Sequence, residues 1–539
     1  MVKLAENALD PNASETRARE NKKISKAKKV SRLEEKLDNL ANLLQSSSAN
    51  GSQTATVTSQ HGDATSATAE SVILETPTLS APSVEEESET EVEECLTRFR
   101  AQLQYFPFVH LPAEVTVSEL RDSRPFLWKC IMAIATLSVT KQRALGLQIH
   151  KLAAERLVVN HERTMDLLLG LLGYLAWSNY QVGPNQLFIS MYCHLAILLV
   201  QDMGLDVPPR DVSSQPLACL KAHGFSRHLA TRRTMEERRA LVATYLVTSE
   251  MSAFRSVYIH LNTESMRWNP QIEEALQALE EQKESPLDLR LVTMAKLRRI
   301  GSEVTLPSSL PPAQHSEHLI TLQAFQANTL LGRLEGLKER LPSDFITDTV
   351  LQLQILGTEL EIHAPLVHQA PPPKPVPGSQ RLAVLTRCLY TTRQWLDVFH
   401  IVEPTVCAML PFSTWAQLAL VTTILYRLSL LEEQGWDKRM AQNTVDLIEE
   451  MAKIINLVQQ LPSQAGLTSE SASDGDPFTK MAKVLNLMKT GWEPQLRPNN
   501  NGATDVAVFD PPLSDNLDAF ECLDGMNWIA ESFFSWNGQ

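Results

Sequence analysis

The sequence is poor in cysteine, with seven in 539 residues, and no two of them form a C-x-x-C pair. No cysteine precedes Cys95. An odd number of widely spaced cysteines argues against a disulfide framework or a zinc site and indicates reduced, buried thiols in an intracellular protein. The first twenty residues contain no apolar segment, so we expect no secretory signal. The longest apolar run, 187–200, is interrupted by polar residues and is too short to span a bilayer.

The motifs of common enzyme classes are also absent. The sequence contains no G-x-x-x-x-G-K-[ST], G-x-G-x-x-G, G-x-S-x-G or H-E-x-x-H, and no two aspartates are adjacent. The histidines show no ligand spacing, and His194, in an apolar helix, is expected to be a core or interface residue. The aromatic stripe in the same region favours core packing over an effector pocket; its members are Trp177, Tyr180, Phe188 and Tyr192. We therefore expect no enzyme activity and assign no catalytic residue, no metal ligand and no cofactor.

No alternating strand pattern is present, whereas helical periodicity recurs from residue 95 to residue 490. Local signals mark several helix ends. Thr234 and Glu237 form the pattern of a capping box, and Gly204 is placed to end a helix. The predicted fold class is therefore all-α, a large body of packed helix pairs.

Shifts in composition divide the chain into six predicted segments. A flexible start is followed by a basic segment with a short coil, a disordered Ser/Thr-rich and acidic linker, two helical parts of one domain, and a disordered acidic tail. The boundaries are 1–21, 22–45, 46–94, 95–305, 306–495 and 496–539.

The basic segment combines a cluster of cations with a short leucine repeat. The cations, expected to contact phosphate or serve as a nuclear-import signal, are Lys22, Lys23, Lys26, Lys28, Lys29 and Arg32. The repeat has the 3, 4 spacing of a coiled-coil seam and consists of Val30, Leu33, Leu37, Leu40 and Leu44. Cations directly before a dimer seam are typical of regulators that lay paired basic segments on DNA. The alternative is a charged surface helix that packs on its own domain.

The last forty residues have the opposite charge, since no lysine or arginine follows Arg497. Acidic residues alternate there with large apolar ones, which is typical of an activation segment that docks into a coactivator groove. The candidate docking residues are Leu517, Phe520, Leu523, Trp528, Phe533, Phe534 and Trp536. A terminal helix folded back on the body is the alternative. The net charge of −14 excludes a general nucleic-acid binder, so different partners are expected at the two ends.

Taken in order, these segments resemble the fungal zinc-cluster transcription factors that carry a fungal transcription-factor homology domain. The resemblance rests on KKVSRLEEKLDNLANLL, YFPFVHLP, SRPFLWKCIMAIAT, LAAERLVVNHERTMDLLLGLLGYLAW, ISMYCHLAILLVQDMGLD and TMEERRALVATYLVTS. It implies a nuclear, dimeric regulator whose homology domain covers 95–305 and whose activation region is C-terminal.

The chain departs from that family at its N-terminus. The resemblance implies a six-cysteine cluster that holds two zinc ions just before the basic segment, and its ligands are absent from this sequence. Two readings follow. The chain is a pathway-specific or secondary-metabolite transcription regulator acting on DNA directly or through a partner, or it is a DNA-binding-deficient co-regulator or decoy that associates with intact zinc-cluster factors. The expected partners are a second copy or a related regulator, DNA and a coactivator, with no membrane.

Overall fold

A computed structural model describes residues 88–177, 188–209, 232–258, 264–304, 317–368, 380–468 and 476–497. All of them belong to one compact unit, Ser80–Gln539. The helices of its first half are α2 (Glu89–Gln102), α3 (Val117–Ser123), α4 (Pro125–Ala135), α5 (Val139–Ala153), a π-helical turn (Ala154–Val159), α6 (Met165–Ala176), α7 (Phe188–Asp202), α9 (Met235–Tyr258), α10 (Pro270–Gln282) and α11 (Asp288–Ser302).

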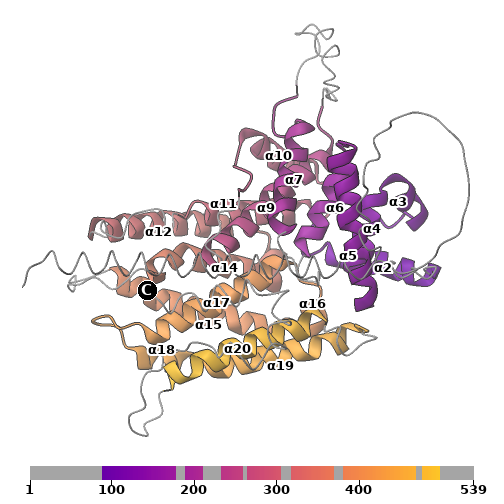
Figure 1. Cartoon of the computed structure of the whole chain (residues 1–539). Helices are drawn as coiled ribbons and strands as arrows, with labels where there is room; N and C mark the ends of the chain where they lie inside the picture. Colours follow the sequence, from indigo (N-terminus) through magenta and orange to yellow (C-terminus); the bar gives the residue numbers. More distant parts are fainter. Residues whose placement is uncertain are drawn as a thin grey trace, which may run out of the picture. The chain divides into compact units, whose positions relative to one another are not determined.

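The second half continues the same architecture (Figure 1). Its helices are α12 (Glu317–Lys338), α13 (Ser343–Ile346), α14 (Thr349–His368), α15 (Gln380–Ile401), α16 (Pro404–Cys407), α17 (Phe412–Leu430), α18 (Lys438–Thr444), α19 (Leu447–Ala465) and α20 (Pro477–Leu496). Within the described ranges, extended pairing is limited to one isolated bridge between Ser138 and Thr468. The all-α prediction is confirmed.

Two apolar helices form the centre of the first half. Every residue of α6 after Met165 is buried, and so is nearly every residue of α4. The two helices pack on each other, and α2 and α5 pack on α4. Gly170 permits this close approach, because the Cβ atom of any other residue at this position would lie only 2.4–2.7 Å from ring carbons of Phe126. Helices without a polar face are stable only inside a core, which is why α4 and α6 lie there.

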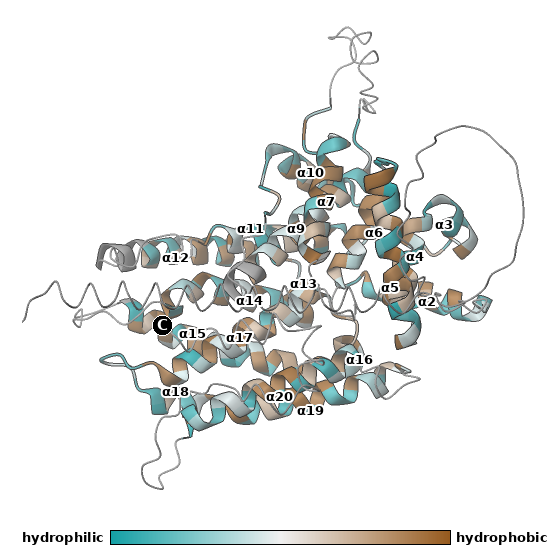
Figure 2. Cartoon of the chain, in the orientation of Figure 1, coloured by the Kyte–Doolittle hydropathy of each residue, from teal (hydrophilic) through white to brown (hydrophobic). Residues whose placement is uncertain are grey.

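The two halves share one hydrophobic core. Its buried members extend from Val92 to Trp492. In the second half α14 packs on α15 and α19 on α20, while α17 contacts α6, α9 and α14. The buried indole of Trp177 donates to the Met409 carbonyl at 3.0 Å, and the rings of Phe254 and Phe412 lie 5.1 Å apart. In Figure 2 α19 and α20 each carry both hydrophobic and hydrophilic residues, as expected for helices with one face in this core.

Local capping signals decide where several helices begin and end. Thr234 Oγ1 accepts the Glu237 N–H at 3.1 Å, and the Glu237 carboxylate accepts the Thr234 N–H at 2.8 Å, so the predicted capping box is confirmed. Gly204 has a φ of 66° just after α7, as predicted for its C-cap.

Two predicted boundaries differ from the structure. Helix α2 begins at Glu89, before the expected start of the body at Cys95, because Ser88 caps it and Val92 is already buried. The helical periodicity of the sequence also predicts one helix from Lys438 to Gln460, but the structure divides it into α18 and α19. The division arises because Asp446 leaves the helical conformation and caps α19 through the N–H groups of Ile448 and Glu449.

Candidate functional site

The functional residues predicted from the sequence lie outside the described residues. This holds for the cations of 22–32, for the seam of 30–44 and for the acidic-aromatic residues of 517–536. Their roles stay predictions.

The aromatic stripe is described only in part. Trp177 and Tyr192 are fully buried core residues, as expected, whereas Tyr180 and the side chain of Phe188 lie outside the described residues. His194 is not a core residue: it is exposed on α7, with its Nδ1 2.6 Å from the Ser190 carbonyl oxygen. The apolar run around it suggested burial, but α7 turns one side of that run outward.

The described part of the chain has neither a metal-ligand cluster nor a helix able to cross a membrane. No group of three or more His, Cys, Asp or Glu residues is placed there to hold a metal ion. None of its helices combines the length and the apolar character that crossing a bilayer requires.

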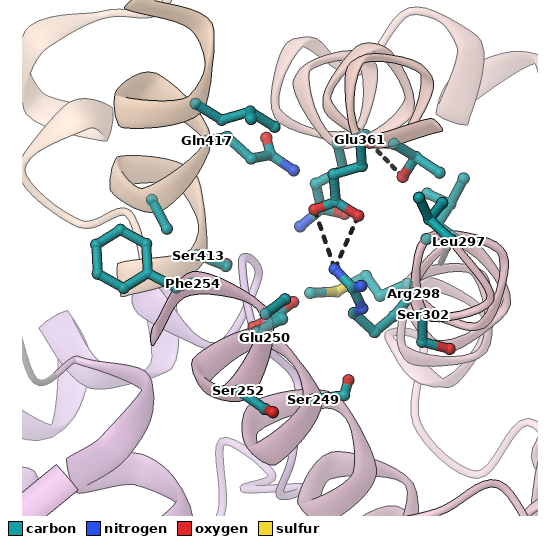
Figure 3. A pocket seen from close by; sticks show the side chains of 18 of the residues that line it. Ser249, Glu250, Ser252, Phe254, Leu297, Arg298, Ser302, Glu361, Ser413 and Gln417 are labelled. Carbon is teal, nitrogen blue, oxygen red and sulfur yellow. Dashed lines mark hydrogen bonds and ion pairs between the residues drawn. The ribbon is translucent and has the colours of Figure 1, made fainter. Parts of the chain in front are cut away.

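A cavity of about 280 Å³ lies between α9, α11, α14 and α17. Its apolar wall includes Phe254 of α9, Met294 and Leu297 of α11, and Leu420 of α17. Polar side chains from all four helices also line it. They include the carboxyl groups of Glu250 and Glu361 and the guanidinium of Arg298 (Figure 3). A mostly apolar cavity with a few convergent polar groups is the usual character of a small-molecule site.

An ion pair between a buried arginine and a partly buried glutamate crosses the cavity from α11 to α14. Arg298 Nη1 donates to both carboxylate oxygens of Glu361, at 3.0 and 2.9 Å (Figure 3). Burial alone lowers the pKa of Arg298, but Glu361 and Glu250 raise it above its ordinary value, so the guanidinium stays charged. Gly301 leaves room for the pair, because a Cβ atom there would overlap the Glu361 carboxylate.

Glu250 of α9 supplies a second acid to the same cavity (Figure 3). Withdrawal from water raises the pKa of its carboxyl to about 8, with Arg298 lowering that pKa and Glu361 raising it further. The cavity thus contains two acids and one guanidinium, and that guanidinium is already paired. At neutral pH Glu250 keeps its proton for lack of a second cation.

Three buried polar atoms in the cavity wall have no hydrogen-bond partner among the described residues. They are Oε1 of Gln354, Oε1 of Gln417 and Nε of Arg298. Gln354 and Arg298 are each only 9% exposed. Gly357 makes space for the Gln417 amide, since a Cβ atom at this glycine would lie 2.5 Å from it. Buried polar groups are normally satisfied, so these three atoms are available to a water or to another bound molecule.

The sequence alone did not point to this cavity. Arg298 and Glu361 are 63 positions apart, and Glu250 lies on a third helix. The sequence signal for the cavity was Glu250, an acid in the largely apolar run LVATYLVTSEMSAF. Such an acid is weak evidence for a site when no charged partner can be assigned to it from the sequence.

Comparison with known proteins gives matches over most of the chain. The family model ATEG07667_C, described as a C-terminal domain, matches residues 404–537. The transcription factor opdL of Penicillium oxalicum is 31% identical over 461 residues, covering 83% of this chain and 79% of that protein.

Two further fungal proteins are more distant. A transcription factor of Aspergillus terreus is 26% identical over 69% of this chain, and the transcription factor himD of Aspergillus japonicus is 26% identical over 73%. These alignments span 56% and 64% of the respective relatives, less than two thirds of each. No solved structure matches the chain.

Proposed function

Because the chain belongs to the fungal transcription-factor family that its sequence resembles, we propose that it regulates the genes of one fungal pathway, such as a secondary-metabolite gene set. The observation that carries the proposal is the 31% identity to opdL, which extends over 79% of that transcription factor.

The proposed regulator is nuclear and dimeric. Support for dimerisation comes from the seam between Val30 and Leu44, which directly follows the basic cluster. The seam is only about two heptads long, and isolated helices of that length are marginal in water. In this proposal the seam orients two chains, and further contacts between the chains add to their affinity.

DNA contact in this proposal is made by the basic cluster and is electrostatic. The six cations between Lys22 and Arg32 can neutralise phosphates but offer few of the fork pairings that discriminate bases. Sequence selectivity then comes from a partner, or from zinc-cluster residues that the family would place before the basic cluster.

A second candidate function is a co-regulator or decoy that associates with intact zinc-cluster factors. The seam between Val30 and Leu44 supports it, because pairing with an intact factor requires only such a seam. Both candidates use the seam for pairing, and they differ in whether the chain reaches its target genes without a partner.

Activation is assigned to the C-terminal tail. Its acids keep Trp528, Phe533 and Trp536 solvated until they dock into a coactivator groove. Residues 500–539 fused to a heterologous DNA-binding domain are expected to activate a reporter. Changing the four aromatic residues of 528–536 to Ala should remove that activity, whereas an inert wild-type fusion would favour a tail folded back on the body.

The proposed function is tested by chromatin immunoprecipitation of the tagged full chain in its fungal host, combined with transcript profiling after deletion of its gene. We expect occupancy at the promoters of one co-regulated gene set whose transcripts change on deletion. Occupancy that disappears when a zinc-cluster partner is removed would favour the co-regulator. Unchanged transcripts and no occupancy would contradict both candidates.

A further inference from the structure

The cavity between α9, α11, α14 and α17 is not required by either candidate function, and its polar groups are incompletely satisfied. From its geometry we propose that it binds a small, partly apolar organic cation, an amine whose ammonium group is held by Glu250 and whose carbon skeleton lies against the apolar wall. This inference does not depend on DNA binding or on the proposed gene targets.

The charges that line the cavity favour a cation. Glu361 is already paired with Arg298 at 2.9 Å, so Glu250 is the acid of the cavity that has no cation of its own among the lining residues, although the charge of Arg298 also acts on it. Helix α17 adds only uncharged side chains there, including Ser413 and Gln417. An anionic ligand would find no free cation, because the Arg298 guanidinium is already paired with Glu361, so carboxylates and phosphates are disfavoured.

The hydrogen-bonding atoms favour a donor. The two unpartnered amide oxygens, those of Gln354 and Gln417, accept hydrogen bonds, as does the Glu250 carboxylate once it gives up its proton on binding a cation. An ammonium group has three N–H donors and no acceptor, so it can satisfy several of these atoms together. The unpartnered Arg298 Nε–H can donate one hydrogen bond to an acceptor elsewhere on the ligand, such as a hydroxyl or carbonyl oxygen.

The size and the composition of the cavity limit the ligand further. A volume of about 280 Å³ is just below the range typical of ligand sites, about 300–1,000 Å³, so the ligand must be small. Phe254, Met294 and Leu297 offer an apolar surface opposite the polar groups. The best match is therefore a compact arylalkyl or alkyl amine rather than a metal ion, a sugar phosphate or a peptide.

The test is a ligand-observed NMR screen of the full chain with a fragment set in which each ring system occurs as an amine, an alcohol and a carboxylate. We expect amines to bind in preference to the alcohols and carboxylates of the same ring. Glu250→Gln keeps the shape of the side chain and removes its charge, so it should weaken amine binding at least about tenfold. Glu339→Gln, at an exposed position in the turn directly after α12, is the matched control and should leave binding unchanged.

Two further measurements separate this site from non-specific binding. Ala416→Leu extends a side chain into the cavity from α17 and should reduce amine binding irrespective of charge. Amine affinity for the wild type should rise between pH 6 and about 8, as Glu250 loses its proton opposite Arg298 and Glu361, and should be flat in Glu250→Gln. Absence of amine binding, equal binding of the carboxylates, or amine binding that survives both substitutions would overturn the proposal.

Discussion

At the scale of single residues, Glu250 makes the free energy of unfolding depend on pH in an unusual direction. The pKa of its carboxyl is about 8 in the folded chain and 4.5 as the ordinary value, so between these values only the folded state keeps the proton. Its contribution to stability is complete below pH 4.5 and is lost as the pH rises through about 8.

Glu250→Gln is therefore expected to stabilise the protein increasingly as the pH rises. The expected gain in the free energy of unfolding is about 2 kcal/mol at pH 8, which is less than the full pKa shift would give because the side chain is partly exposed to solvent. Denaturant unfolding at pH 6 and pH 8 measures this, with Glu339→Gln as the control. A difference between variant and wild type that does not change with pH would contradict the expected protonation.

His363 has the opposite dependence. Its side chain is fully buried, and burial lowers its pKa to about 4, with Arg387 lowering it further and Glu359 opposing both. Below pH 6.5 the unfolded chain binds a proton that the folded chain refuses, so stability is lost as the pH falls from 6.5 towards 4.

His363→Leu is expected to make the protein more resistant to acid than the wild type. The free energy of unfolding of the variant minus that of the wild type should be about 2 kcal/mol higher at pH 4.5 than at pH 7. The free energy of unfolding at the two pH values measures this. His400→Leu is the control, because His400 is partly exposed and contacts Glu450 at 2.8 Å. An equal effect of both substitutions would contradict the role of burial.

At the scale of elements, Asp166 joins α6 to the start of α4. Its carboxylate accepts the N–H groups of Phe126 at 3.2 Å and of Leu127 at 2.9 Å, and it pairs with Arg156 at 2.9 Å. The residue before α4, Arg124, makes no capping bond with its side chain, so the cap comes from another helix. A local sequence pattern cannot show such a cap.

Asp166→Ala is expected to cost about 2–4 kcal/mol, since it leaves two buried N–H groups without their acceptor and removes one of the two carboxylates that pair with Arg156, the other being Glu162. Asp166→Asn keeps one acceptor oxygen and should cost less. Asp437→Ala removes an ordinary exposed cap from α18 and should cost about 1 kcal/mol. Denaturant unfolding ranks the three, and a cost for Asp166→Ala no greater than that for Asp437→Ala would contradict this account.

The proposed seam is the other element open to a direct test. Replacing Leu37 and Leu40 by Asp places charges on the apolar face and should shift the full chain towards monomer in sedimentation at micromolar concentration. Asn39→Asp with Asn42→Asp adds the same charge at positions that face away from the seam and should have no effect. A leucine variant with unchanged mass would show that the seam does not contribute to self-association.

At the scale of the whole molecule, the distribution of charge governs contact with DNA. The net charge is −14, and the cations that favour DNA are concentrated between Lys22 and Arg32. That cluster can neutralise about four to six phosphates per chain, which gives salt-sensitive binding with little sequence preference.

The full chain alone should therefore bind DNA weakly, with affinity falling roughly 10²- to 10³-fold between 50 and 200 mM salt. Competition between unrelated duplexes, with and without a chelator, measures site preference and any zinc requirement. Sub-micromolar, sequence-selective binding would refute the expectation, and sensitivity to the chelator would reveal a metal site.

Much of the fold follows from the sequence because helix signals are local. The capping box of Thr234 and Glu237 acts within three residues, Gly204 ends α7 by its own conformation, and the apolar character of α4 and α6 predicts their burial. Likewise, the cations, the seam and the tail are patterns within short segments, and the family resemblance depends on their order.

The cavity and its chemistry were decided only by the tertiary structure. Glu250, Arg298 and Glu361 are ordinary charged residues of three separate helices, and nothing within one turn of any of them marks a site. They meet because α9, α11 and α14 cross with α17, with Gly301 and Gly357 leaving space for the Glu361 and Gln417 side chains. The raised pKa of Glu250 has the same origin, since withdrawal from water depends on all the helices around a carboxyl and not on its neighbours in the sequence.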